Sequence, residues 1–405
     1  FHLFLRSSVS KIVLGTILLF SLGISGSLNA QTIYALSGNN LISFDAASPT
    51  NLLSNKSITG IAAGQSIAGL DFRPNTGELY ALGYNQMTGE ARLYTINLIS
   101  GGATAIGTMP VALKTGMGKI GFDFNPTVDR IRVTGSNNSN YRLHPVTGAI
   151  AATDLDLAFA ASDFNSAANP SIGAVAYTNS YIGTTATTLY NYDDSLNMLT
   201  TQIPPNNGVL NTVGASGISV NLNDPSTDMD IFFDAVAGMN RAFLAANTSM
   251  SVIDRLYSIS LATGETTLIG SIGVAVSDIA VFIDRTVPNY VTGQIVWALT
   301  SNNNLVSFAS GLPGTIRNIV TVSGVAAGQT LVGMDFRPAT SELYALGYNP
   351  MNGEARLYTL NLTTGTATAI GTAPIVLKAG MGKVSVDFNP TVDRIRVTGS
   401  DNSNF

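Results

Sequence analysis

Short runs in which apolar and polar residues alternate one by one recur along the chain after residue 30. Turns rich in Gly, Asn, Asp and Thr separate these runs. A period of two is typical of β-strands that bury one face. No stretch after residue 30 shows the 3.6-residue period of an amphipathic helix. The pattern therefore predicts an all-β protein made of many short strands.

Two series of similar strings recur, mostly about every fifty residues, out of phase with each other. The first, a strand–turn–strand unit, is clearest at Leu93–Gly107 and Leu256–Gly270. The second is a short apolar run that suits an inner strand. Both series contain five units, and a period of this length made of four short strands is characteristic of β-propeller blades. The aligned positions are Ile42, Tyr94, Tyr141, Tyr190 and Tyr257 in the first series, and Gly69, Gly121, Gly173, Gly217 and Ser277 in the second.

The two ends of this repeat array complement each other. Ser277–Phe282 is predicted to be an inner strand with no outer strands after it, and Ile33–Ile58 to be outer strands with no inner strand before them. Pairing them gives one composite blade and closes a ring without exposed edges. We expect five blades; six stay open because Gly217–Gly270 is long, and a pair of β-sandwiches is the alternative fold.

A longer repeat contains the shorter one. Ile61–Asn140 recurs as Val325–Asn404 at a constant offset of 264 residues. We expect one complete β-propeller-like domain at 31–284, a linker at 285–292, and a truncated second copy at 293–405. Because the second copy lacks the closing strand and the later blades, we expect it to be open or marginally stable.

The first thirty residues have the order of a secretory signal peptide. Arg6 and Lys11 precede an apolar run, Ile12–Ile24, and small residues follow up to Ala30. The run is short for a membrane span, which needs about 20 residues. We expect cleavage after Ala30, a mature chain without a membrane span, and a secreted, periplasmic or cell-surface location. An uncleaved anchor is the alternative.

The composition excludes several classes of partner and site. Charged residues make up 11% of the chain and the net charge is −5; removal of Arg6 and Lys11 changes it to −7. An acidic chain without basic clusters does not suit nucleic acid. The absence of Cys excludes disulfides, thiolate metal sites and Cys nucleophiles.

No catalytic set stands out. His144 is the only histidine after the predicted signal peptide, which excludes a zinc site built on His and Cys, and no Gly-x-Ser-x-Gly string is present. Gly116–Gly121 fits Gly-x-Gly-x-x-Gly, but a strand is predicted after it rather than the helix that dinucleotide binding requires. We therefore expect a protein that is not an enzyme.

Aspartates form the candidate site. Asp71 and Asp123 occupy the same place in two predicted inner strands, and Asp278 is close to the equivalent place in the closing strand. If they face the axis, they line an acidic channel suited to Ca²⁺, which prefers six to eight oxygen ligands. The structural alternative is that they bond to backbone amides or to nearby arginines. These arginines are Arg73, Arg130 and Arg132.

A second acidic group lies in Asn221–Asp234, where Asp224, Asp228 and Asp230 are candidate Ca²⁺ ligands. The segment lacks the Gly and the final Glu of a helix-loop-helix calcium loop. The alternative is a solvated surface loop. We expect no cofactor other than Ca²⁺.

Several strings in this order resemble a known family. They are the run from Asp123 to Val133, Ala176–Asn179, Gln202–Gly208 and Leu261–Gly270. The combination resembles the bacterial family catalogued as domain of unknown function 4394. The resemblance implies an exported bacterial protein, often with tandem domains, and implies no catalytic residues.

Three functions remain open from the sequence. The first is an exported, non-catalytic binding or scaffold module for an extracellular ligand, a polysaccharide or a protein, in which tandem copies raise avidity. The second is a Ca²⁺-dependent hydrolase or lyase that uses the channel carboxylates. The third is a structural repeat of a surface layer or matrix.

Overall fold

The computed structural model describes residues 31–223, 226–248, 253–285, 293–300 and 303–405. Within these ranges the regular structure is β, apart from one short 3₁₀ turn, η1 (Pro205–Asn207). None of the helical structure in the described ranges is long and apolar enough to cross a membrane. The predicted signal peptide, residues 1–30, lies outside the described residues.

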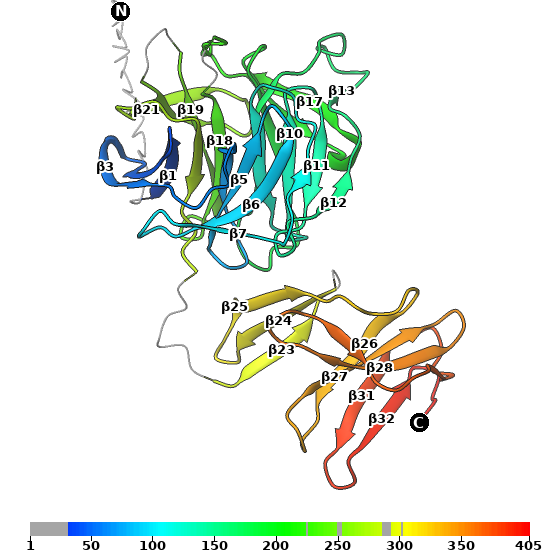
Figure 1. The fold of residues 1–405 in the computed structure, drawn as a ribbon. Helices are drawn as coiled ribbons and strands as arrows, with labels where there is room; N and C mark the ends of the chain where they lie inside the picture. Colours follow the sequence, from blue (N-terminus) through cyan, green and yellow to red (C-terminus); the bar gives the residue numbers. More distant parts are fainter. Residues whose placement is uncertain (1–30, 224–225, 249–252, 286–292, 301–302) are drawn as a thin grey trace, which may run out of the picture.

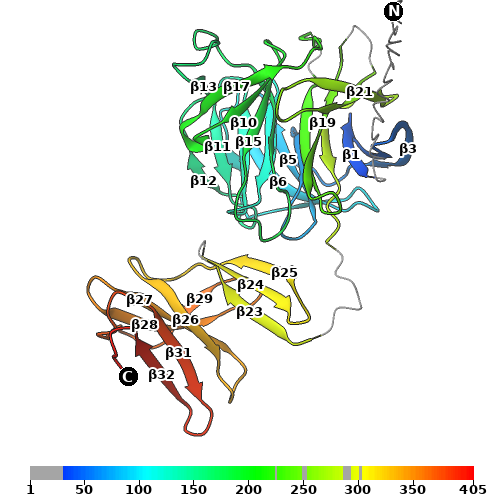
Figure 2. The ribbon, with the colours of Figure 1, turned by 180° about the vertical axis from the view of Figure 1, so that it is seen from behind.

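The first copy consists of five sheets (Figures 1 and 2). Two of them follow each other along the chain. One is β4 (Ser66–Phe72), β5 (Leu79–Asn85), β6 (Glu90–Ile96) and β7 (Ala103–Ala105), with β8 (Val111–Ala112) also on β6. The next is β9 (Ile120–Asn125), β10 (Arg130–Gly135), β11 (Asn140–Leu143) and β12 (Ile150–Thr153).

The third and fourth sheets continue the series. The third is β14 (Ile172–Tyr177), β15 (Leu189–Asp193), β16 (Met198–Gln202) and β17 (Val209–Ala215), with β13 (Ala158–Phe159) parallel to β17. The fourth is β18 (Asp228–Asp234), β19 (Met239–Ala246), β20 (Arg255–Ile259) and β21 (Thr266–Ser271). Each of these four sheets contains four consecutive antiparallel strands, as predicted, and two of them carry one further short strand, β8 or β13.

The fifth sheet joins the two ends of the copy. Its order is β22 (Asp278–Val281), β1 (Thr32–Ser37), β2 (Asn40–Asp45) and β3 (Ser48–Ser57). β22 lies antiparallel to β1, with Ile33 opposite Val281. The first strands of the sheets, β4, β9, β14, β18 and β22, contact one another in this order, and β22 contacts β4. The composite blade predicted from the two ends therefore closes the ring.

Apolar side chains of neighbouring sheets form the cores of this ring. Leu82 on β5, for example, packs with Phe122 and Val133 of the next sheet, and all are buried. Each strand thus sends alternate side chains into one of two interfaces, which is the reason for the period-two pattern in the sequence.

The prediction of one inner strand was wrong. Gly217–Val220 was expected to be the inner strand of the fourth blade, but this place belongs to β18. In β18, Met229 and Ile231 are buried in the core between blades, and Asp228 and Asp230 alternate with them. The alternative of a solvated surface loop is wrong for Asp228, Asp230 and Asp234, which are buried on β18, while Asp224 lies outside the described residues.

The second copy repeats the start of the first, in three sheets. They are β23 (Ile295–Leu299), β24 (Asn304–Ala309) and β25 (Leu312–Thr321); β26 (Thr330–Phe336), β27 (Leu343–Asn349), β28 (Glu354–Leu360), β29 (Ala367–Ala369) and β30 (Ile375–Val376); and β31 (Val384–Asn389) with β32 (Arg394–Gly399). The register repeats as well, since Asp335 lies opposite Tyr344 as Asp71 lies opposite Tyr80. In the described part of this copy, β23 pairs with β24 alone.

Candidate functional site

Five aspartates gather along the inner strands of the first copy. Asp71 lies on β4, Asp123 on β9, Asp228 and Asp230 on β18, and Asp278 on β22. All five are between 2% and 6% exposed. All five are among the candidate ligands predicted from the sequence. A sixth candidate, Asp224, lies outside the described residues.

Each of these carboxylates accepts a hydrogen bond from a backbone N–H of the next inner strand. The bonds link β22 to β4, β4 to β9, β9 to β14, and β18 to β22. They run from Leu70 N to Asp278 (2.7 Å), Phe124 N to Asp71 (2.7 Å), Tyr177 N to Asp123 (3.0 Å), Ile279 N to Asp228 (2.8 Å) and Val281 N to Asp230 (2.6 Å). The aspartates therefore cross-link neighbouring blades.

The structural alternative was that the aspartates bond to backbone amides or to nearby arginines. The amides are indeed their partners, whereas the three arginines are not. Arg73 pairs with Asp129 at 2.5 Å and Arg132 with Asp154 at 2.6 Å, while Arg130 donates to backbone carbonyls. The partners of these three arginines are therefore groups other than the five aspartates.

Three of the five carboxylates also converge. Asp71, Asp123 and Asp230 each offer an oxygen, and these oxygens all lie within 4.8 Å of one another. The trio differs from the predicted set of Asp71, Asp123 and Asp278, because Asp230 replaces Asp278. Three carboxylates from three strands are a donor set of the type that a hard divalent cation prefers.

The burial of all five aspartates disfavours five bare negative charges. Burial raises the pKa of Asp230 to about 6 and that of Asp228 to about 7. Burial, with repulsion from neighbouring carboxylates, raises the pKa values of Asp71, Asp123 and Asp278 well above the ordinary range. Either protons or a cation must therefore offset the charge at neutral pH.

Lys119 is a positive group near these aspartates, and no motif in the sequence pointed to it. Its Nζ donates to the backbone oxygen of Ser277, and its charge lowers the pKa values of Asp194, Asp228 and Asp278, against the larger effect of burial. Lys119 stands inside the Gly116–Gly121 string, which was considered only as a nucleotide loop. As expected, the string leads into a strand, since β9 begins at Ile120.

Asp194 occupies the place of a missing side chain. A β-carbon on Gly173 would lie 2.1 Å from its Oδ2. Burial raises the pKa of Asp194 to about 7. Gly173 is therefore required by a close approach of a carboxyl group rather than by a turn.

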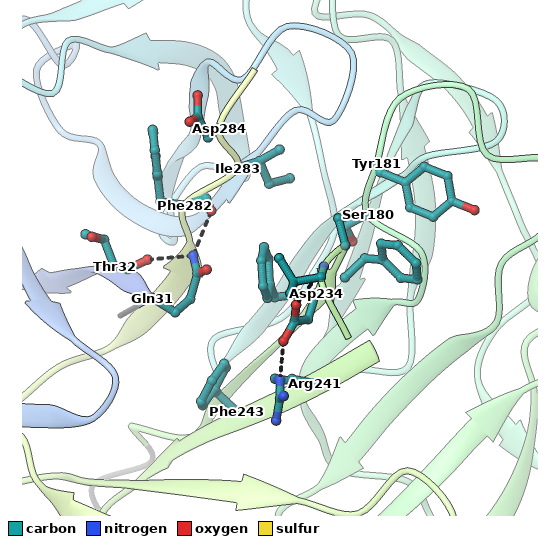
Figure 3. A pocket seen from close by; sticks show the side chains of 14 residues that line it. Gln31, Thr32, Ser180, Tyr181, Asp234, Arg241, Phe243, Phe282, Ile283 and Asp284 are labelled. Carbon is teal, nitrogen blue, oxygen red and sulfur yellow. Dashed lines mark hydrogen bonds and ion pairs between the residues drawn. The ribbon is translucent and has the colours of Figure 1, made fainter. Parts of the chain in front are cut away.

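A pocket of about 650 Å³ opens where β18 and β22 end (Figure 3). Its walls come from segments far apart in the sequence, including the start of β1 and the loop after β14. Five aromatic rings line it: Tyr181, Phe232, Phe233, Phe243 and Phe282. The size and the aromatic lining are those of a small-molecule or side-chain binding site.

Polar groups are held at fixed positions on the pocket wall (Figure 3). Arg241 Nε donates to Asp234 Oδ2 at 2.8 Å, and Gln31 Nε2 donates to the backbone oxygen of Phe282 at 2.9 Å. The rings of Tyr181 and Phe233 are 4.5 Å apart at 45°. Tyr181 is 38% exposed, so its ring is accessible to a ligand.

The remaining candidates have local roles. His144 Nδ1 accepts the N–H of Val146 in the turn after β11. Three of the tyrosines that recur at blade spacing are buried, namely Tyr94, Tyr141 and Tyr257, while Tyr190 is partly buried. The hydroxyl of Tyr94 donates to Gln65.

Comparison with known proteins identifies the family of the chain. The sequence profile of a family described as "Domain of unknown function (DUF4394)" matches residues 40–280 and 304–405. No curated protein matches the chain.

Three similar solved structures have low scores. A protein from Lactobacillus plantarum is 13% identical at a TM-score of 0.32, with 86% of this chain and 98% of that chain covered. The Dos1 propeller is 12% identical at 0.31, with 92% and 88% covered. The glutaminyl cyclase of Myxococcus xanthus is 10% identical at 0.35, with 58% and 94% covered. At such scores, the propeller-like fold rests on the strand pairing described above.

Proposed function

Because the chain belongs to a family of unknown function, DUF4394, we propose its function from the geometry: it is an exported, non-catalytic binding module. The observation that carries this proposal is the aromatic pocket at the end of β18 and β22. With cleavage after Ala30, the new α-amino group of Gln31 would join the pocket wall.

The ligand we propose for this pocket is a segment of a neutral polysaccharide. A sugar ring has an apolar face of C–H groups and hydroxyls at its rim. The C–H face would pack on the rings of Tyr181 and Phe233. The hydroxyls would form hydrogen bonds with Asp234, Arg241 and Gln31. The net charge of −5 disfavours anionic polymers. An aromatic peptide side chain is the competing ligand.

A glycan and peptide array probed with the full chain tests this proposal. The expected result is binding to at least one neutral glycan by the wild type, at least tenfold weaker in Phe233→Ala. Phe164→Ala is the matched control, since Phe164 is 74% exposed and is not part of the pocket wall. If the chain binds peptides alone, the ligand is a peptide rather than a polysaccharide. If Phe233→Ala and Phe164→Ala bind equally well, the pocket is not the binding site.

A second proposal concerns a metal ion at the buried aspartates. We propose that one Ca²⁺ binds between Asp71, Asp123 and Asp230, which supply three carboxylate ligands from three strands. The ion would offset charges that burial otherwise forces to be protonated. It would join the blades that β4, β9 and β18 begin.

Thermal unfolding of the full chain in EDTA and in excess Ca²⁺ tests the cation. A ligand at about 100 times its Kd stabilises by about 2.7 kcal/mol. For a domain of this size the midpoint would rise by about 5–10 °C. Asp230→Asn should lose the rise, while Asp335→Asn should keep it. Asp335 is the counterpart of Asp71 in the second copy, and the described residues show no trio there.

The two alternative functions have less support. A Ca²⁺-dependent hydrolase or lyase needs carboxylates that reach a substrate, whereas Asp71, Asp123 and Asp278 are at most 6% exposed and each accepts a backbone N–H. A surface-layer or matrix repeat needs no ligand pocket, so a structural role alone does not explain the aromatic walls.

A further inference from the structure

Lys119 makes a contact that the proposed functions do not use. It directly precedes β9, and its Nζ donates to the backbone oxygen of Ser277, which directly precedes β22. In the order of the ring, β4 stands between these two strands and contacts both. The lysine side chain therefore bridges two inner strands that are not neighbours, at the end where both strands begin.

Three buried carboxyl groups lie within reach of the charge of this ammonium. Lys119 lowers the pKa values of Asp194, Asp228 and Asp278, which burial raises. Asp228 and Asp278 are the first residues of β18 and β22. Each accepts one backbone N–H, through Oδ2 of Asp228 and Oδ1 of Asp278. A carboxylate has about four lone-pair sites, so both groups can accept a further partner.

Asp194 and Thr227 have unsatisfied oxygens at the same end of the inner strands. Asp194 lies against Gly173, the second residue of β14, and Thr227 directly precedes β18. Asp194 is 4% exposed and Thr227 is fully buried. Within the part of the chain that the structure describes, neither Asp194 Oδ1 nor Thr227 Oγ1 has a hydrogen-bond partner. Buried polar atoms are normally satisfied, so these two oxygens indicate a ligand.

We propose that these oxygens form a second cation site, which Lys119 fills with its own ammonium group. Its ligands would be the oxygens that gather at the strand starts, namely those of Ser277, Thr227, Asp194, Asp228 and Asp278. Carbonyl and carboxylate oxygens are typical ligands of Ca²⁺. The site shares no ligand with the proposed Ca²⁺ site of the trio defined above, and either site can exist without the other.

The tethered ammonium determines how many ions the ring binds. A lysine ammonium donates hydrogen bonds but cannot accept them, so it suits a set of acceptors. Its positive charge repels a free divalent cation at short range. Without Lys119, the three buried carboxyl groups lose their nearby positive charge, and burial of charge without a partner is costly. A free cation of matching chemistry would then take the place of the ammonium.

Equilibrium dialysis of the full chain against millimolar Ca²⁺ tests this inference by counting the bound ions. Lys119→Met removes the charge and keeps an unbranched side chain. We expect this variant to bind one Ca²⁺ more per chain than the wild type. Lys119→Arg keeps the charge and should bind as many ions as the wild type. Lys383→Met, the same change at the counterpart of Lys119 in the second copy, is the matched control and should not alter the count.

Double variants locate the additional ion. Lys119→Met/Asp194→Asn and Lys119→Met/Thr227→Val should lose it, because each lacks one ligand of the site. Lys119→Met/Asp230→Asn should keep it, because Asp230 belongs to the trio. The trio is tested by the count of the wild type, whereas this inference is tested by the difference between Lys119→Met and the wild type.

Circular dichroism in EDTA first checks that each variant is folded, and Lys119→Gln replaces Lys119→Met if the latter is not. The inference is overturned if the folded variant binds no more Ca²⁺ than the wild type. It is also overturned if the additional ion persists after Asp194→Asn and Thr227→Val.

Discussion

Arg132 is a fully buried cation. If it loses its carboxylate partner, we expect the first copy to unfold at a much lower temperature. It is 1% exposed and donates to Asp154 (2.6 Å), Asn140 (2.7 Å) and Asn206 (2.8 Å), and also to the hydroxyl of Tyr177 (3.2 Å). Tyr177 lies on β14 and Asn206 in η1, so the guanidinium ties the second sheet to the third.

Asp154→Ala removes the only carboxylate that contacts Arg132 in the described residues. Leaving a buried charge without its partner costs about 3–5 kcal/mol. For a domain of this size, the midpoint of thermal unfolding should fall by about 6–20 °C. Far-UV circular dichroism of the full chain during heating measures this change.

Two variants serve as controls for Asp154→Ala. Arg142 also pairs with Asp154 but is 30% exposed, so Arg142→Gln should cost only about 0–1 kcal/mol. Arg396, the counterpart of Arg132, has an exposed bond to Asn404, and Arg396→Ala should have an equally small effect. If Asp154→Ala lowers the midpoint no more than these controls, the buried network does not hold the two sheets together.

Two further predictions concern the buried carboxyl groups. In EDTA, the midpoint should fall as the pH rises from about 4 to about 7. The reason is that the raised pKa values of Asp228 and Asp230, about 7 and about 6, make the folded state bind protons more tightly than the unfolded chain in this range. Excess Ca²⁺ should weaken this trend, and a rising midpoint would contradict it. Gly173→Ala should destabilise by about 1–3 kcal/mol through its clash with Asp194, whereas Gly314→Ala, where a β-carbon meets nothing within 4 Å, should be nearly neutral in chemical denaturation.

The ring and its closure could be predicted from the sequence because both depend on local patterns. Alternation of apolar residues marks each strand, and the repeated strings show which strands are equivalent. The sequence has an inner strand around Asp278 without outer strands and outer strands after Ile33 without an inner strand, so pairing of the two segments could be predicted. Asp71 and Asp123 were found in the same way, since equivalent strands place them at equivalent points on the axis.

β18 and the pocket could not be predicted, for two different reasons. Asp228 and Asp230 alternate with Met229 and Ile231, but acidic residues normally lie in solvent, and only the ring provides amides that can satisfy them. The pocket has no sequence pattern because its walls are the ends of strands that only the closed ring brings together. In the sequence, the pair Phe232-Phe233 near the end of a strand is a sign of such a pocket.

The most direct test of the binding proposal is hydrogen–deuterium exchange of the full chain with and without the glycan that the array identifies. We expect slower exchange in segments that line the pocket, namely 180–181, 232–236 and 282–284, and no change in the second copy. Protection only around Lys119 or only in the second copy, with none in these segments, would contradict the binding proposal.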